Sequence, residues 1–252
     1  MIEVKDIYKS FGENEVLKGI SATFEKGNTS LIIGTSGSGK TVFIKCMLGL
    51  FIPDKGDILY DGRSYIAMST KEKRLLRQEM GMVFQGGALF DSETIEDNIM
   101  FPLKMFTEQS KEEMLERVNF VLKRVRLENV NQKYPAELSG GMQKRVAIAR
   151  AIVMNPKYLF CDEPNSGLDP KTATIIDNLI QEITDEYQMI TVINTHDMNS
   201  VMEIGEKIIF LKNGVKEWEG SDKTIFKTDN KSVTNFVYSS NLFRKVREVY
   251  NK

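Results

Sequence analysis

The sequence predicts an α/β fold: a mainly parallel sheet, an N-terminal antiparallel β-subdomain and an inserted α-helical subdomain. Three observations predict it. Short apolar runs that end in polar residues recur along the chain, which is typical of buried parallel strands. Residues 1–25 alternate and turn like antiparallel strands. Residues from about 92 to about 155 instead have helical periodicity, so we expect the helical subdomain there.

The other elements follow in chain order. Residues 57–62 predict a further strand and turn, and residues 112–125 a charged amphipathic helix with a solvated face. Strand patterns return at residues 158, 190 and 207. Asn213-Gly214 is a hairpin-turn signal, and it leads into a strand pattern over residues 215–219.

A Gly-rich loop at residues 34–41 predicts a phosphate-binding site. It matches the pattern G-x-x-x-x-G-K-[ST] in full. Its glycines let backbone N–H groups close around phosphates, Lys40 adds a positive charge, and the Thr41 hydroxyl can ligate Mg²⁺. A Gly-rich turn that matches by chance is the alternative, and the flanking strand and helix patterns disfavour it. The residues assigned to phosphate binding are Gly34, Thr35, Ser36, Gly37, Ser38, Gly39, Lys40 and Thr41.

Two carboxylates follow the apolar run at residues 157–161. A buried strand of an open α/β sheet delivers such residues to its C-terminal edge, where these sheets bind ligands. Asp162 is suited to hold Mg²⁺, directly or through water, and Glu163 is then placed to polarise an attacking water as general base. A strand end followed by a polar turn is the alternative, and downstream of a phosphate-binding loop it is the weaker interpretation.

Gln85 and His196 end two further strand patterns at the same predicted edge. Gln85 follows residues 81–84, and we expect it to contact Mg²⁺ or water while responding to whatever binds the next loop. His196 is the single histidine of the chain. A lone histidine is more often structural, but its place after a core strand favours hydrogen bonds to a γ-phosphate and to the attacking water.

A second Gly-rich element, residues 138–143, begins a predicted helix. Ser139, Gly140 and Gly141 stand at its start, where free N–H groups and the positive end of the helix dipole make an anion site. The chain already has one complete phosphate site. We therefore expect this second element to complete the pocket of another copy of the chain.

Together these motifs resemble those of the ATP-binding cassette (ABC) ATPases over residues 1–225. The resemblance is carried by residues 34–41, Gln85, residues 138–143, Cys161-Asp162-Glu163-Pro164, Ser166-Gly167-Leu168-Asp169 and His196. It implies a P-loop NTPase core within the ABC ATPase fold, with ATP and Mg²⁺ as cofactors and ATP hydrolysis as the activity.

The resemblance also implies a homodimer that sandwiches two ATP molecules head to tail. Ser139 and Gly141 of one subunit would then cap the γ-phosphate held by Lys40 of the other. Asp169 would lie at the interface between the two subunits.

Two further positions near these motifs concern adenine stacking and the loop after Glu163. By resemblance, an early aromatic residue stacks on adenine: Phe11 fits best, with Tyr8 as the alternative. Asn165 departs from the family, which usually has Thr there. Because one polar residue replaces another, we expect no loss of activity.

Composition agrees with an intracellular enzyme. The formal net charge of −1 gives no general attraction to nucleic acid or anionic lipid. The two cysteines, Cys46 and Cys161, lie in apolar segments and are interpreted as reduced and buried. The first residues resemble a strand and not a signal peptide, and no apolar run approaches the ~20 residues that a membrane helix needs. Any path across a membrane would belong to other chains.

The loop after Gln85 is apolar for its position. Gly86-Gly87-Ala88-Leu89-Phe90 places two large hydrophobic residues where the family receives a helix of its membrane subunit. Residues 99–103 add apolar surface. A locally packed loop is the alternative, since single exposed apolar residues are common.

Residues beside the motifs are most similar to the ATPases of Mla/MCE-type phospholipid transporters. They include Met142, Lys144 and residues 195–198. This resemblance implies phospholipid transport between membranes, integral-membrane permease subunits, an MCE substrate-binding protein, and a peripheral location on the cytoplasmic face of the inner membrane. The alternatives are an ATPase of another importer or exporter, for amino acids or lipoproteins, and a soluble ABC ATPase that acts on DNA or ribosomes.

The C-terminal segment is assigned to a separate extension, residues 226–252, after an ABC ATPase domain at 1–225. Residues 221–231 are polar and turn-rich. Residues 235–252 are rich in aromatic and apolar side chains, with Leu242, Val246, Val249 and Tyr250 on one helical face. This extension is expected either to pack on its own subunit or to reach the partner copy.

Overall fold

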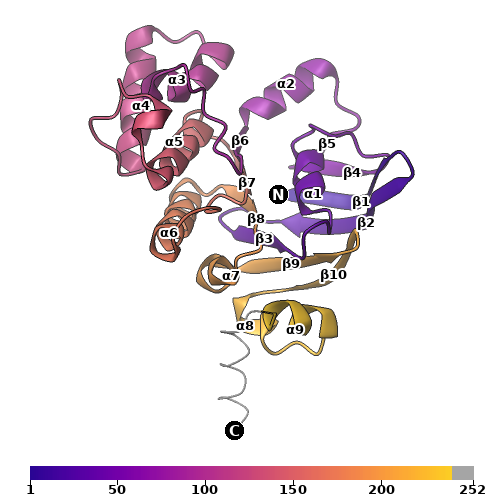
Figure 1. Cartoon of the computed structure of the whole chain (residues 1–252). Helices are drawn as coiled ribbons and strands as arrows, with labels where there is room; N and C mark the ends of the chain where they lie inside the picture. The colour runs from indigo at the N-terminus through magenta and orange to yellow at the C-terminus, as the bar shows by residue number, and fades with distance from the viewer. Residues whose placement is uncertain (240–252) are drawn as a thin grey trace.

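A computed structural model of the protein describes residues 1–239 (Figure 1). The larger of its two sheets has six strands in the order β10-β9-β3-β8-β7-β6. All neighbouring strands in it are parallel except β10, which pairs antiparallel with β9. Its strands are β3 (Thr29–Ile33), β6 (Met80–Val83), β7 (Tyr158–Asp162), β8 (Ile190–Asn194), β9 (Lys207–Lys212) and β10 (Val215–Gly220).

The smaller sheet is antiparallel and has the order β2-β1-β4-β5. Its strands are β1 (Ile2–Phe11), β2 (Asn14–Phe24), β4 (Lys55–Tyr60) and β5 (Arg63–Ser64). Ile2, Val4 and Ile7 are buried, which accounts for the alternation in the sequence. The predicted N-terminal antiparallel β-subdomain is therefore confirmed.

Helices cover both faces of the larger sheet. The helices of the described chain are α1 (Lys40–Met47), α2 (Thr70–Gln78), α3 (Ile95–Phe106), α4 (Lys111–Arg124), the 3₁₀ turn η1 (Pro135–Glu137), α5 (Gly140–Ile152), α6 (Pro170–Tyr187), α7 (Met198–Ile204), α8 (Asp222–Ile225) and α9 (Lys231–Val237). Figure 1 shows α3, α4 and α5 gathered to one side of the sheets, where the helical subdomain was predicted.

Alternate residues of the central strands enter two separate cores. In β3, Leu31 and Ile33 belong to the core beneath the helical group, whereas Ile32 belongs to the core shared with β1, β2 and α1. All five residues of β3 are buried, so its sequence does not alternate between apolar and polar: Thr29 and Ser30 come first, and the strand ends in the apolar run Leu31-Ile32-Ile33. Both predicted buried cysteines, Cys46 and Cys161, are buried.

The predicted amphipathic helix and the predicted hairpin turn are both present. Helix α4 matches the predicted amphipathic helix, and Ser110 and Glu113 form a capping box at its start. At the predicted hairpin turn, Asn213 and Gly214 both have positive φ, 50° and 83°, which the turn between β9 and β10 requires. Residues 221–231, interpreted as polar and turn-rich, also contain the short helix α8.

The described part of the C-terminal segment packs on its own subunit. Val233 and Val237 of α9 are fully buried in the core, and the ring of Phe236 lies 5.4 Å from that of Phe210. Residues 240–252, with the predicted helical face at Leu242, Val246, Val249 and Tyr250, lie outside the described residues. Among the helices that are described, none is long and apolar enough to cross a membrane.

Candidate active site

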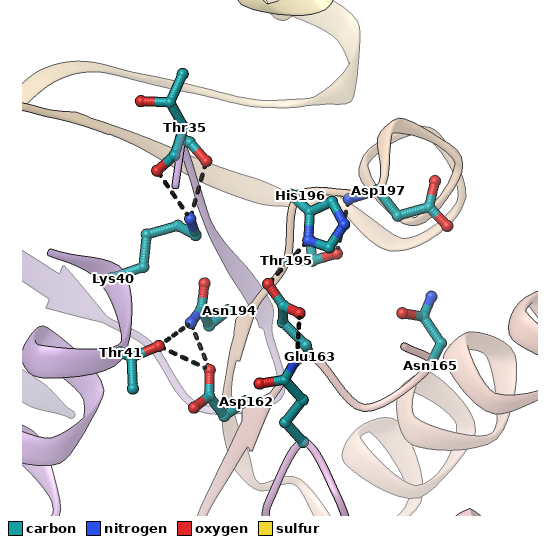
Figure 2. A network of polar contacts seen from close by, with 12 residues as sticks. Thr35, Lys40, Thr41, Asp162, Glu163, Asn165, Asn194, Thr195, His196 and Asp197 are labelled. Carbon is teal, nitrogen blue, oxygen red and sulfur yellow. Dashed lines mark hydrogen bonds and ion pairs between the residues drawn. The ribbon is translucent and has the colours of Figure 1, made fainter. Parts of the chain in front are cut away.

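The predicted phosphate-binding loop connects β3 to α1. Gly39, the residue before the helix, has φ 99°, and a Cβ there would lie 2.8 Å from a methyl carbon of Leu17, so glycine is required. Lys40 turns back over the loop, and its Nζ atom donates to the backbone oxygens of Gly34 and Thr35 at 2.9 and 3.1 Å (Figure 2). Burial lowers the pKa of Lys40, and the charges of Glu163 and Asp162 partly oppose this shift.

Asp162 and Thr41 meet at the end of β7, as the sequence predicted. Thr41 Oγ1 donates to Asp162 Oδ1 at 3.3 Å. Asn194 joins them from the end of β8: its amide donates to Thr41 Oγ1 at 3.2 Å and to Asp162 Oδ1 at 2.5 Å (Figure 2). Asn194 was not predicted as a site residue, although it is also a polar residue at a strand end, the signal that identified Gln85.

Glu163 is held from two sides. Gln85 Nε2 donates to Glu163 Oε2 at 3.0 Å, and His196 Nδ1 lies 2.8 Å from Glu163 Oε1 (Figure 2). Glu163 has φ 48°, a left-handed conformation that costs a residue with a side chain roughly 1–2 kcal/mol. Its backbone N–H donates to Asn194 O at 2.9 Å. The structure thus brings together three strand-end residues that the sequence predicted to meet.

A hollow of about 1080 Å³ joins the phosphate-binding loop to this triad. It is large enough for a nucleotide. Its lining includes the loop residues from Gly34 to Thr41 except Ser38, with Gln85, Glu163 and His196, and also Asn14 and Val16 of β2 and Ser232 and Asn235 of α9. The contribution of α9 could not be read from the sequence.

Phe11 lies beside this hollow without lining it. Its side chain is 44% exposed, and its ring centroid lies 5.1 Å from that of Phe51 in an edge-to-face arrangement. Asn14 and Val16, at the start of β2, are the hairpin residues that line the hollow. Stacking of Phe11, or of Tyr8, on adenine remains a prediction.

The second Gly-rich element stands apart from the hollow. Ser139 is the N-cap of α5, and its Oγ accepts from Met142 N at 3.3 Å. Ser139 and Gly140 are exposed, whereas Gly141 is buried, and a Cβ on Gly141 would lie 2.6 Å from the Thr172 methyl carbon. Thr172 belongs to α6, and its N–H donates to Oδ1 of Asp169, the N-cap of that helix, at 3.1 Å.

Two cations of α5 hold the loop after Gln85. Lys144 Nζ donates to the backbone oxygen of Gln85, and Arg150 donates to the backbone oxygens of Gly87 and Ala88 at 2.7 and 2.8 Å. Burial lowers the pKa of both Lys144 and Arg150. The helix that starts at Ser139 is thus tied to the loop that carries Gln85, a link that no short sequence pattern would reveal.

The same loop borders an apolar groove. Phe90 is 42% exposed, and its ring lies 5.0 Å from that of Phe101 of α3. The apolar residues that line the groove are Met80, Met82, Phe84, Ala88, Phe90, Phe101, Pro102, Phe106, Ala151 and Met154. The two alternatives for this loop each hold for one residue: Phe90 is exposed, whereas Leu89 is partly buried and packs against the core, because the loop turns it inward.

The donor set fits a nucleotide with a divalent cation. Ser38 Oγ and Asn194 Oδ1 are buried and have no hydrogen-bond partner within residues 1–239. Groups of this kind are normally satisfied, so they are suited to hydrogen bonds with a ligand or water. No three His, Cys, Asp or Glu side chains in the described chain form a cluster that could bind a metal by themselves. A cation at Thr41 and Asp162 would therefore complete its coordination with phosphate oxygens and water.

A Gly-rich phosphate loop, a strand-end aspartate and a glutamate held by Gln and His define a P-loop nucleoside triphosphatase. A family model described as ABC transporter matches residues 17–166. The chain is 41% identical over 226 residues to the methionine import ATP-binding protein MetN of Clostridium tetani. This match covers 90% of this chain and 71% of that protein. It therefore belongs to the ABC transporter family, as an ATP-binding, ATP-hydrolysing member.

Other relatives agree on the family and differ in their described cargo. The chain is 40% identical over 198 residues to the probable ribonucleotide transport ATP-binding protein mkl of Mycobacterium leprae, and this match covers 79% of this chain and 57% of that protein. Both relatives are named as ATP-binding proteins of import or transport, and those names give different cargoes.

Solved structures confirm the predicted ABC ATPase fold. The dimeric structure of the bacterial ABC transporter cassette MJ0796 has a TM-score of 0.80 and 33% identity, and the match covers 88% of this chain and 99% of that one. A second structure of MJ0796 is a dimer in a post-hydrolysis state bound to ADP and Pi. CbiO1 from Clostridium perfringens, part of the transporter complex cbiONQ, has a TM-score of 0.84 and 30% identity over the full length of this chain and 98% of its own.

Proposed function

We propose that this ATPase energises a membrane transporter and that Glu163 is its general base. The observation that carries this proposal is the position of the Glu163 carboxylate, which is fixed between Gln85 and His196 at one end of the hollow that contains Lys40. A carboxylate in this position can accept the proton of a water that attacks the γ-phosphate.

The other residues of the site bind and orient the nucleotide. The backbone N–H groups of residues 34–41 surround the phosphates, and Lys40 exchanges its contacts with Gly34 O and Thr35 O for phosphate oxygens. Thr41, Asp162 and Gln85 are the residues that would hold Mg²⁺, which when bound neutralises charge that develops on the phosphates. Asn194 keeps the Asp162 carboxylate turned toward Thr41.

The active unit is proposed to be a two-fold dimer with composite sites. Ser139 and Gly140 are exposed and do not line the hollow formed by the described residues of their own subunit. Placed over the hollow of a second copy, the N-terminus of α5 would supply N–H donors and a positive dipole end to the γ-phosphate held by Lys40. Asp169 would then lie at the same interface, since it caps the helix that packs against Gly141.

The groove that contains Phe90 is proposed to dock a permease subunit. Phe84, Phe90 and Phe101 are 37%, 42% and 43% exposed, a grouping of large apolar side chains that favours a protein partner over water. The groove lies on the loop that Lys144 and Arg150 tie to α5. A movement of the partner would therefore reach both Gln85 and the cap at Ser139.

For the cargo we propose phospholipid, moved between membranes by a complex that includes an MCE substrate-binding protein. The residues beside the motifs support this proposal: Met142 and Lys144 on α5, and residues 195–198 at the end of β8. It implies a peripheral location on the cytoplasmic face of the inner membrane, held there by the permease. Import of an amino acid is the second candidate, because the 41% identical relative is named a methionine import protein.

Purification of the intact complex distinguishes these cargoes. The tagged chain is isolated from gently solubilised membranes, and its protein partners and bound small molecules are identified by mass spectrometry. Phospholipid transport predicts an MCE protein among the partners, together with enriched phospholipid. A co-purified amino-acid-binding protein without lipid enrichment would instead support amino-acid import.

A further inference from the structure

Beneath the predicted catalytic residues lies a buried polar network of three side chains. Asn165, Asp177 and Ser200 are 7%, 2% and 1% exposed. The Asn165 amide donates to both carboxylate oxygens of Asp177, at 3.2 and 3.1 Å, and to Ser200 Oγ at 2.9 Å. Ser200 Oγ in turn donates to Asp177 Oδ2 at 2.7 Å. Each member of the network thus contacts the other two.

The network joins three segments that carry the site. Asn165 lies on the loop that leaves Glu163, Asp177 lies in the middle of α6, and Ser200 lies in the first turn of α7. Helix α7 is capped by Asp197, the residue after His196. Figure 2 shows Asn165 on the loop that leaves Glu163, near the helix that starts at Asp197. The network therefore connects, in the interior, the same two segments that Glu163 and His196 connect at the surface.

The contact between Glu163 and His196 is itself open to solvent. The His196 side chain is 64% exposed, and Glu163 is held in a left-handed conformation. Backbone hydrogen bonds close the turn, from Ser166 N to Glu163 O at 3.1 Å and from Leu168 N to Asn165 O at 3.3 Å, and Glu163 N donates to Asn194 O of β8 at 2.9 Å, but none of these three bonds reaches α6 or α7. The Asn165 side chain reaches both helices: α6 through Asp177 and α7 through Ser200.

We propose that Asn165 is a positioning residue for ATP hydrolysis: its amide, through Asp177 and Ser200, fixes the loop of Glu163 relative to the helix that follows His196. A buried polar group adds little net stability when an apolar group of similar shape can replace it, but its hydrogen bonds accept only one geometry. The amide also reaches two acceptors at once, which the shorter Thr side chain usual in the family would not do in the same way.

The test compares single and exchanged substitutions in the full-length protein. Asn165→Leu keeps the branching at Cγ, with a somewhat larger side chain, and removes both N–H donors. The double substitution Asn165→Asp with Asp177→Asn exchanges the amide and the carboxylate, so that the same contacts can form in the reverse direction. Thr184→Val is the matched control: Thr184 lies on α6, is fully buried, and shares a hydrogen bond of 2.6 Å with Thr191, away from the Glu163 loop.

For each variant, kcat and KM for ATP, nucleotide affinity and Tm are measured. Displacement of a catalytic group by about 1 Å can cost about 10²-fold, so we expect kcat of Asn165→Leu to fall at least about tenfold, with nucleotide affinity within about twofold of wild type. The exchanged pair should recover most of that kcat. Thr184→Val should lower Tm and leave kcat unchanged.

Three results would overturn the proposal: kcat of Asn165→Leu within about twofold of wild type, no recovery in the exchanged pair, or a fall of kcat in Thr184→Val that follows its Tm. If Asn165→Leu does not fold, Ser200→Ala takes its place as the milder variant, because it removes only the Ser200 hydroxyl from the network. It should lower kcat at unchanged nucleotide affinity, and an unchanged kcat would also reject the proposal. None of these measurements depends on the cargo.

Discussion

Nδ1 of His196 lies 2.8 Å from Oε1 of Glu163, although the His196 side chain is 64% exposed and that of Glu163 only 17%. A half-buried carboxylate thus orients a solvent-exposed imidazole, and Gln85 Nε2 donates to the other carboxylate oxygen at 3.0 Å. Both carboxylate oxygens of Glu163 are thus in contact with a neighbouring side chain, and the shape and the charge of the Glu163 side chain can be separated by substitution.

Glu163→Gln keeps the shape of the side chain and removes the base. We expect ATP affinity to be retained, turnover to fall about 10²-fold or more, and the protein to accumulate as an ATP-bound dimer. Steady-state ATPase assays and size-exclusion chromatography with ATP measure these effects. Lys40→Ala is the control and should lose nucleotide binding itself. Near-normal turnover in Glu163→Gln would remove Glu163 from the role of base.

Mixing two inactive variants tests the composite site. Ser139→Arg blocks the cap, and Lys40→Ala removes the phosphate contact, so neither homodimer has an intact site. In a mixed dimer, Lys40 of one chain faces Ser139 of the other, and a 1:1 mixture should recover about a quarter of the wild-type rate if subunits pair at random. An additive, near-zero rate in the mixture would show that both elements act within one chain.

Phe90→Asp combined with Phe101→Asp tests the groove as a docking site. Burial of two such side chains is worth roughly 3–6 kcal/mol, so the permease complex should dissociate while the isolated protein still binds nucleotide. Pull-down from solubilised membranes measures assembly. Phe120→Asp, on an exposed residue of α4 outside the groove, should leave assembly intact. Intact assembly of the double variant would place the dock elsewhere.

The stability of the protein should depend on pH through Asp177. Burial raises the pKa of this carboxyl from 3.8 to about 6; the charges of Asp197 and Glu203 add to the shift, while hydrogen bonds from Ser200 and Asn165 oppose it. The folded state therefore binds more protons than the unfolded state between these two values, and stability falls as the pH rises through them.

Asp177→Asn removes this titration. Between pH 4.5 and 7, the free energy of unfolding of the wild type should fall relative to that of the variant by about 2 kcal/mol. Urea denaturation at several pH values measures the difference. Asp185→Asn, on an exposed position of the same helix, controls for the general loss of a carboxylate. A difference that stays constant with pH would contradict the raised pKa of Asp177.

The strand-end residues of the site could be predicted because their chemistry follows from local pattern. An apolar run of strand length places its last residues at one edge of a parallel sheet, which brought Gln85, Asp162 and His196 to the same region. The same reasoning would have found Asn194. The caps at Ser139 and Asp169 also follow from local residue type, since Ser and Asp accept from the N–H groups of the following turn.

What could not be predicted depends on contacts between residues distant in the chain. Lys144 and Gln85 are 59 positions apart, and Asn165 and Ser200 are 35 apart. Leu89 and Phe90 are neighbours with similar side chains, and only the packed loop decides that one faces the core and the other the groove. Likewise, the place of α9 beside the nucleotide hollow results from packing of Val233 and Val237 on the sheet.

The separation of Ser139 from the hollow that contains Lys40 has a consequence for kinetic order. Far below the dissociation constant of the dimer, the ATPase rate of the free chain should scale with the square of its concentration, and the specific activity should halve with each twofold dilution. A permease that holds two copies side by side replaces this bimolecular step with a fixed effective concentration. A turnover number for the free chain therefore describes a pair of polypeptides and holds only at the concentration at which it is measured. Within the complex, the turnover number no longer depends on the concentration of the chain.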